Sequence, residues 1–235
     1  MIKSEIHKPD TFLYFAYGAN LLKFQIRMHN PSAEFVSIAR LDNYRLDFLK
    51  YSQFWGGPVG TIVPTANAHV WGVIWRLHKD DLENLDNQKD IDTRKFYVKY
   101  LEVLTPYMGT FRCRTYIQKV NPLPRGNRDV IPVERWPSWS YKTVILMGAR
   151  EHGLPNHYIR FLRKLKDNGD EGCFRTSCLL TRYAKDVPCG CRVPGKILRK
   201  PLMIDLKRIR EEKELPKVQP KPVPVKKPPR KKLQF

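Results

Sequence analysis

The sequence predicts an α+β domain in which about six strands form one sheet and helices pack outside it. Apolar and aromatic runs of strand length recur in the first half of the chain, and residues 70–77 place large apolar side chains at alternate positions. Residues 141–151 and 156–166 instead have helical spacing, with a Gly-Leu-Pro turn between them. With 235 residues, 42% hydrophobic and 28% charged, the chain can bury one sizeable core.

The first strand leads directly into a turn that has the features of an anion site. Residues 12–17 (FLYFAY) are apolar on both faces, as in a fully buried strand. Gly18 permits a sharp reversal and close approach of a ligand, and Asn20 is suited to cap a helix over residues 21–28. The amides of residues 17–20 would then converge on a volume that attracts a carboxylate or an oxyanion. An ordinary corner without a ligand fits the same residues.

The remaining elements follow in order along the chain. The further strands are predicted at residues 35–41, 44–49, 70–77, 95–104 and 110–118. We expect the first two of these to form a hairpin at Asp42-Asn43. Residues 79–87 are helical in pattern, and residues 121–140 are rich in Pro, Arg and Trp and predict a long loop.

The charge distribution divides the chain into a domain and a basic tail. The formal net charge is +20, and roughly half of the excess lies after residue 195. We expect a flexible N-terminus over residues 1–10, a compact domain over residues 11–168, and a basic, partly disordered tail over residues 169–235. The first ten residues lack the apolar core of a signal peptide and no run is long enough to span a bilayer, so a cytoplasmic location is expected, or a nuclear one because of the tail.

The cysteines indicate reduced thiols. Their number, five, is odd, and no secretory signal is present. Cys173, Cys178, Cys189 and Cys191 do not have the paired CxxC spacing of common zinc sites, so no metal is predicted. Cys113 lies between two arginines, which would lower the pKa of its thiol, but a buried structural cysteine in a strand also fits.

Four segments of the chain together resemble the γ-glutamylcyclotransferase family. FAYGANL (15–21) is similar to that family's FAYGSN signature. Three more similar segments follow in the same order, NPSAEFVSIARLDNYRLDF (30–48), HVWGVIWRLHKDDLENLD (69–86) and ILMGAREHGLP (145–155). The resemblance covers roughly residues 11–168, and it implies a curved mixed sheet or small β-barrel.

The resemblance also implies a reaction and a set of binding residues. The α-amino group of a γ-glutamyl amino acid attacks its own γ-carbonyl, which closes 5-oxoproline and expels the amino acid, as in glutathione metabolism. No metal or cofactor is required. The implied substrate-binding residues are Tyr14, Phe15, Ala16, Tyr17, Gly18, Ala19, Asn20, Gly56, Gly57 and Tyr97, the last replaced by Phe96 under another register.

The chain departs from the family pattern where the catalytic base is expected. The family has a glutamate at the position of Lys89, and a protonated lysine has no lone pair to accept a proton. A register shifted by one residue would place Asp90 there, although its carboxylate is one methylene shorter. Ala19 stands where the family usually has serine, which keeps the backbone amide but removes a hydroxyl donor.

Two functions of different classes follow from these observations. The first is a γ-glutamylcyclotransferase that uses Asp90, or a perturbed Lys89, as its base. The second is a catalytically impaired member that binds or scaffolds, with a tail that contacts an acidic protein or nucleic acid. A homodimer is compatible with either function.

Overall fold

The structure is a computed structural model that describes residues 8–88, 95–123, 131–173 and 176. All of these residues lie within the unit Met1–Lys196. The strands of the described segments are β1 (Thr11–Ala16), β2 (Glu34–Ser52), β3 (Gly57–His78), β4 (Phe96–Thr105) and β5 (Gly109–Gln118). The α-helices are α2 (Lys23–Arg27), α3 (Leu82–Gln88), α4 (Trp139–Glu151) and α5 (Asn156–Lys164). Short 3₁₀ turns form at η1 (Ala19–Leu21), η2 (Lys79–Asp81) and η3 (Val133–Arg135).

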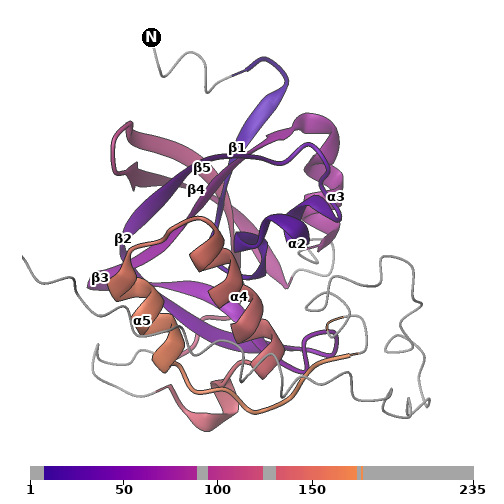
Figure 1. The fold of residues 1–235 in the computed structure, drawn as a ribbon, viewed down its shortest axis with the longest axis vertical. Helices are drawn as coiled ribbons and strands as arrows, with labels where there is room; N and C mark the ends of the chain where they lie inside the picture. The colour runs from indigo at the N-terminus through magenta and orange to yellow at the C-terminus, as the bar shows by residue number, and fades with distance from the viewer. Residues whose placement is uncertain (1–7, 89–94, 124–130, 174–175, 177–235) are drawn as a thin grey trace, which may run out of the picture. The chain divides into compact units, whose positions relative to one another are not determined.

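The strands close into a barrel in the order β1-β3-β2-β4-β5. Neighbouring strands pair antiparallel except β1 and β5, which are parallel where Tyr14 faces Arg114. The expected α+β fold with a curved mixed sheet is therefore confirmed. In Figure 1, α4 and α5 lie side by side over the lower part of the barrel, and α2 and α3 lie at another side. No helix in the described segments is long and apolar enough to cross a membrane.

The predicted hairpin at Asp42-Asn43 is wrong, because β2 continues through it as one strand of 19 residues. A register shift separates the pair Asp42 and His69 from the pair Tyr44 and Pro64. Asn43 takes a left-handed φ of 60° there, as expected of a bulge that bends a strand without ending it. The chain reverses later, at Gly56, whose φ is 70°. The two predicted strands are thus one, and the barrel has five strands rather than about six.

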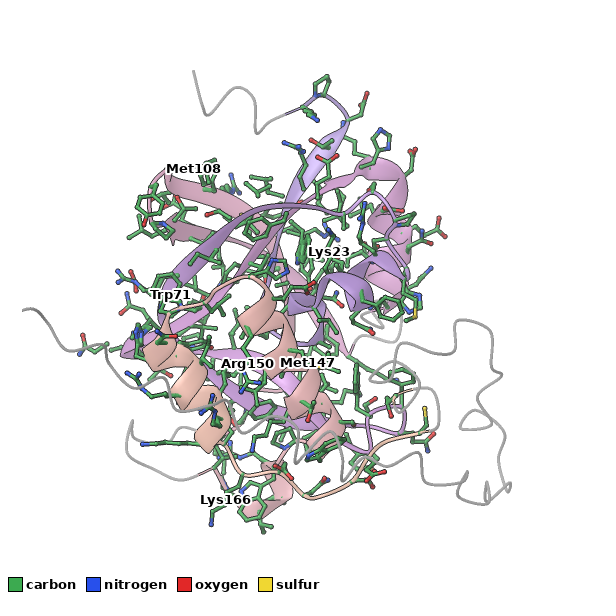
Figure 2. The ribbon with its side chains drawn as sticks, viewed as in Figure 1. Lys23, Trp71, Met108, Met147, Arg150 and Lys166 are labelled. Carbon is green, nitrogen blue, oxygen red and sulfur yellow. The ribbon has the colours of Figure 1, made fainter. Side chains whose placement is uncertain are left out.

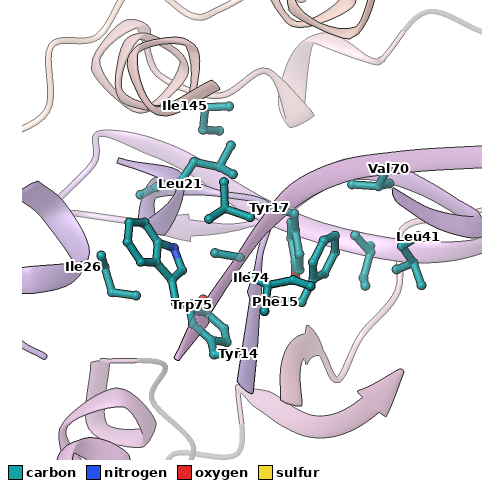
Figure 3. Close-up of a cluster of buried hydrophobic side chains, with 14 of the residues drawn as sticks. Tyr14, Phe15, Tyr17, Leu21, Ile26, Leu41, Val70, Ile74, Trp75 and Ile145 are labelled. Atoms are coloured by element: carbon teal, nitrogen blue, oxygen red, sulfur yellow. The ribbon is translucent and has the colours of Figure 1, made fainter. Parts of the chain in front are cut away.

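The core fills the barrel and the space beneath the helices (Figure 3). Phe15, Ile74 and Trp75 have no exposed surface. Trp75 lies beside Ile26 of α2, and Ile145 of α4 covers Leu21. Burial of large side chains on these elements holds the turn after β1 between the barrel and α4, at roughly 2 kcal/mol for each fully buried side chain.

Contacts with the barrel continue past residue 168, where the domain was expected to end. Asn168 donates its side-chain amide to the Gly56 carbonyl at 3.0 Å. The Cys173 amide donates to the Phe54 carbonyl at 3.1 Å, and the Ser140 amide donates to Asp170 at 3.4 Å. These bonds place residues 168–173 on the β2–β3 turn. The remaining residues expected to form the tail, apart from Thr176, lie outside the described segments.

Candidate active site at the first turn

The turn after β1 forms without the helix cap that the sequence predicts. η1 begins directly after Gly18 without a side-chain cap, and Leu22 is extended before α2 starts at Lys23. The predicted cap by Asn20 is therefore wrong. Gly18 has a φ of −115°, outside the left-handed region that favours glycine. It is required by space, because a Cβ there would lie 2.7 Å from the Tyr141 hydroxyl.

Two backbone amides from separate elements converge on the oxygen of Tyr141. The Gly60 amide, from β3, donates to this hydroxyl at 3.0 Å, and the Ala19 amide of η1 is its second backbone donor. Burial raises the pKa of Tyr141 to about 12, although both amide bonds lower it. Because the oxygen accepts from both amides, its own hydrogen remains to be donated. No acceptor for that hydrogen is present in the described part of the chain.

Helix α4 brings Tyr141 to the turn. Ser138 caps the helix by accepting from the Tyr141 amide at 3.1 Å, which fixes its first turn. Two turns further on, Gly148 lets the helix backbone touch η1, since a Cβ there would lie 2.4 Å from atoms of both Leu21 and Leu22. The same helix therefore sets both the position of the turn and the position of the hydroxyl in it.

Asn20 connects the turn to the end of α3. Its side-chain amide exchanges two hydrogen bonds with that of Gln88, at 3.0 and 3.2 Å, and also donates to Tyr14 at 3.3 Å. Its carbonyl accepts from the Trp75 indole at 2.9 Å. Asn20 is 1% exposed, so these bonds are protected from water. The last described residue of α3 is thereby fixed against the turn.

Tyr17 reaches across the barrel to β5. Its hydroxyl donates to the Tyr116 carbonyl and interacts with the Thr61 side chain. Burial is the main cause that raises the pKa of Tyr17, and nearby tyrosines, including Tyr97, add to this. Tyr97 lies at the start of β4 opposite Ile117 and is 36% exposed. Tyr97 therefore acts electrostatically on the Tyr17 hydroxyl, although it is 80 residues further along the chain.

The other residues predicted to bind substrate are buried in the core or closely packed against neighbouring segments. Phe15 and Ala16 have no exposed surface, and Tyr14 has 4%. A Cβ on Gly56 would lie 2.2 Å from the Asp170 side chain, and one on Gly57 would lie 2.7 Å from the Ser138 amide. Gly56 and Gly57 therefore permit close packing of the 168–172 segment and of the start of α4. Their part in binding stays a prediction.

Lys89 and Asp90, the predicted catalytic residues, lie outside the described segments, as do Cys178, Cys189 and Cys191. Cys113 has no exposed surface, and burial raises the pKa of its thiol to about 12. The interpretation as a buried structural cysteine is confirmed. Among the described residues no group of three or more His, Cys, Asp or Glu is placed to hold a metal ion.

Sequence reasoning did not select Tyr141, Gly60 or Gln88 as site residues. The pattern around Tyr141 predicts only the start of a helix, and nothing local signals contact with a turn 122 residues earlier. Gln88 belongs to a helix whose pattern was correctly predicted, but its pairing with Asn20 depends on how α3 packs. Local sequence thus predicted the elements of the site without their contacts.

Both the sequence and the fold of this chain are similar to those of one class of known proteins. Residues 69–162 match the model of the AIG2-like family. A solved structure described as "Gamma-glutamyl cyclotransferase" superposes with a TM-score of 0.65 at 34% identity, covering 73% of this chain and 99% of that one.

Two curated relatives show which family within this class the chain belongs to. "Gamma-glutamylcyclotransferase" of Mus musculus is 38% identical over 167 residues, which are 69% of this chain and 83% of the relative. The protein of the same name from Homo sapiens is 38% identical over 174 residues, 72% of this chain and 87% of the relative. The chain therefore belongs to the γ-glutamylcyclotransferase family.

Proposed function

We propose that the chain catalyses the cyclisation of γ-glutamyl amino acids or peptides to 5-oxoproline and a free amino acid. One observation supports this most, namely the convergence of the Ala19 and Gly60 amides on the Tyr141 hydroxyl. Both amides fix the hydroxyl oxygen, so the hydroxyl hydrogen is the donor that is left for an oxygen of the substrate. Donors fixed in advance around a developing oxyanion are the largest single contribution in many acyl transfers.

The reaction needs few groups because both reactants belong to one molecule. The α-amino nitrogen of the substrate bonds to its γ-carbon, and the bond from that carbon to the leaving nitrogen breaks. A base takes one proton from the α-ammonium to free its lone pair, and after the attack a second proton leaves the same nitrogen; both end on the leaving nitrogen, which departs as an ammonium. The site must therefore fold the substrate into the attacking geometry, which is worth several orders of magnitude in rate. Neither bond change requires a metal or a redox cofactor.

We assign the base to Asp90, with Lys89 at the position where the family has glutamate. The support comes from the chain itself. Gln88, the last described residue before Lys89, is held against the turn by two side-chain bonds with Asn20, at 3.0 and 3.2 Å. The substrate-binding set retained in this proposal is the turn of residues 17–20, together with Tyr97 and Tyr141.

The first experiment measures 5-oxoproline formed from γ-glutamyl-alanine by the purified full chain. Tyr141→Phe removes the hydroxyl and should lower the rate roughly a hundredfold, the usual effect of losing one donor to an oxyanion. Tyr158→Phe is the matched control, since it removes another buried hydroxyl, on α5 rather than at the turn. Equal rates in the wild type and Tyr141→Phe would contradict the assignment of this hydroxyl.

The second experiment tests the base. Asp90→Asn should abolish product formation if Asp90 takes the proton, whereas Lys89→Glu should raise activity if the lysine has made the chain a poor catalyst. If neither the wild type nor Lys89→Glu forms product, the enzymatic proposal fails. A rise in melting temperature with an anionic amino acid in that case would indicate the binding-module function.

The location and assembly of the protein remain proposals. We expect the reaction to occur in the cytoplasm, or in the nucleus if the basic tail acts as a localisation signal. A homodimer and contacts of the tail with acidic partners are compatible with this function, and size-exclusion chromatography with light scattering would test the dimer.

A further inference from the structure

Helix α5 and the residues just after it present exposed positive charge around one aromatic ring, and one of these cations, Lys166, lies over the Trp136 ring at 5.2 Å from its centroid. Arg160, Arg163, Lys164 and Lys166 are exposed, and Phe161 between them is 40% exposed. We call these five residues the basic face. At about 1.5 Å per residue, the three cations of the helix itself extend over roughly 6 Å along its axis, and Lys166 follows just after the helix ends. In Figure 2 Lys166 marks one end of α5, and Trp71 lies near the other.

Acidic side chains do not neutralise the basic face. Within the described segments none of its four cations forms an ion pair, whereas Arg40, Arg76 and Arg114 each bond a carboxylate. The helix itself has no acidic residue. The first acidic residue after it, Asp167, is bonded to Lys142 of α4 at 3.0 Å. Four adjacent positive charges without counter-charge favour a partner that carries closely spaced negative charges.

The ring of Phe161 is held in place although it is exposed. Its centroid lies 5.4 Å from that of Tyr158, which is 4% exposed and anchored beneath the helix. The next apolar residue, Leu162, is 1% exposed and also belongs to the core. The basic face therefore offers one fixed aromatic ring among four cations.

We propose that the basic face of α5 binds single-stranded nucleic acid. Arg and Lys would neutralise successive phosphates, and Phe161 would stack on a base, which is how proteins bind single strands without reading their sequence. Insertion into an anionic membrane is less favoured, because an interfacial helix buries several apolar residues in lipid and this face has only Phe161. The chain's net charge of +20 adds long-range attraction for a polyanion.

The test measures binding of a fluorescein-labelled oligothymidylate to the full chain by anisotropy, between about 50 and 200 mM salt. Arg160→Gln, Arg163→Gln and Lys164→Gln together should lower the slope of log affinity against log salt by about 2, at about 0.7 for each phosphate that is no longer neutralised. The matched control removes three exposed cations elsewhere, as Lys23→Gln, Arg27→Gln and Lys119→Gln, and should keep the wild-type slope. Circular dichroism checks that both variants fold.

A second variant separates stacking from charge. Phe161→Ala should weaken binding about fivefold or more at fixed salt and leave the slope unchanged, because every cation that neutralises a phosphate is still present. A third variant with the tail cations 226, 227, 230, 231 and 232 replaced by Gln shows whether the tail binds independently. The proposal is overturned if the α5 variant binds like the wild type, if the control is equally impaired, or if phosphatidylserine vesicles bind the chain and the oligonucleotide does not.

Discussion

Replacing Gly148 by alanine tests how α4 positions the first turn. In an exposed helix the change would stabilise the protein by roughly 1 kcal/mol, because alanine has the higher helix propensity. Here the new Cβ would lie 2.4 Å from backbone atoms of both Leu21 and Leu22. Ordinary contact begins at 3.4 Å, so α4 and η1 must separate by 1.0 Å, the difference between these two distances. Backbone atoms cannot move aside as a flexible side chain can.

The separation should affect both stability and catalysis. Overpacking of this kind typically costs about 1–3 kcal/mol, which exceeds the gain in propensity. Tyr141 is on the same helix, and a displacement of its hydroxyl by about 1 Å from the Ala19 and Gly60 amides should reduce the rate on the order of a hundredfold. Urea unfolding and 5-oxoproline formation measure the two effects.

A matched control separates local geometry from general loss of stability. Gly153 has a φ of 64°, and a Cβ added there would meet no atom within 4 Å, so Gly153→Ala costs backbone strain without moving α4 towards the turn. It should destabilise the protein by about 1–2 kcal/mol and keep the wild-type rate. The reasoning would be refuted if Gly148→Ala were more stable than the wild type and equally active.

Two further predictions concern buried charge. Asp47 is fully buried between Arg45 at 3.1 Å and Arg135 at 3.5 Å. Asp47→Asn should therefore lower the free energy of unfolding by about 3 kcal/mol in urea titrations, and Asp42→Asn, at an exposed ion pair, should change it by less than about 1 kcal/mol. Burial lowers the pKa of His152 below 6.5 in the folded state, so the unfolded chain takes up the proton first and stability should fall as the pH drops below that value. The urea midpoint of His152→Phe should depend less on pH, and an unchanged dependence would exclude His152 as the cause.

Local sequence determined most of the elements. Alternation and apolar runs predicted β1, β4 and β5, because a strand buried on one or both faces shows its period directly in the residue types. The helices α4 and α5 were predicted within two residues of their observed ends, since a Gly-Leu-Pro turn separates two helical patterns. The family segments added the barrel, which no local pattern contains.

Tertiary structure alone decided how these elements form a site. β2 passes through Asp42-Asn43 because pairing with β3 on either side of a bulge outweighs the local preference of these residues for a turn. Position 18 requires glycine because a Cβ there would collide with the hydroxyl of Tyr141, and Asn20 bonds Gln88 instead of capping a helix. The contact of Gly18 with Tyr141 joins residues 123 positions apart, and that of Asn20 with Gln88 joins residues 68 positions apart. The physical reason is that a sequence pattern reports the face a residue buries, whereas its partner on that face depends on how the whole barrel and its helices pack.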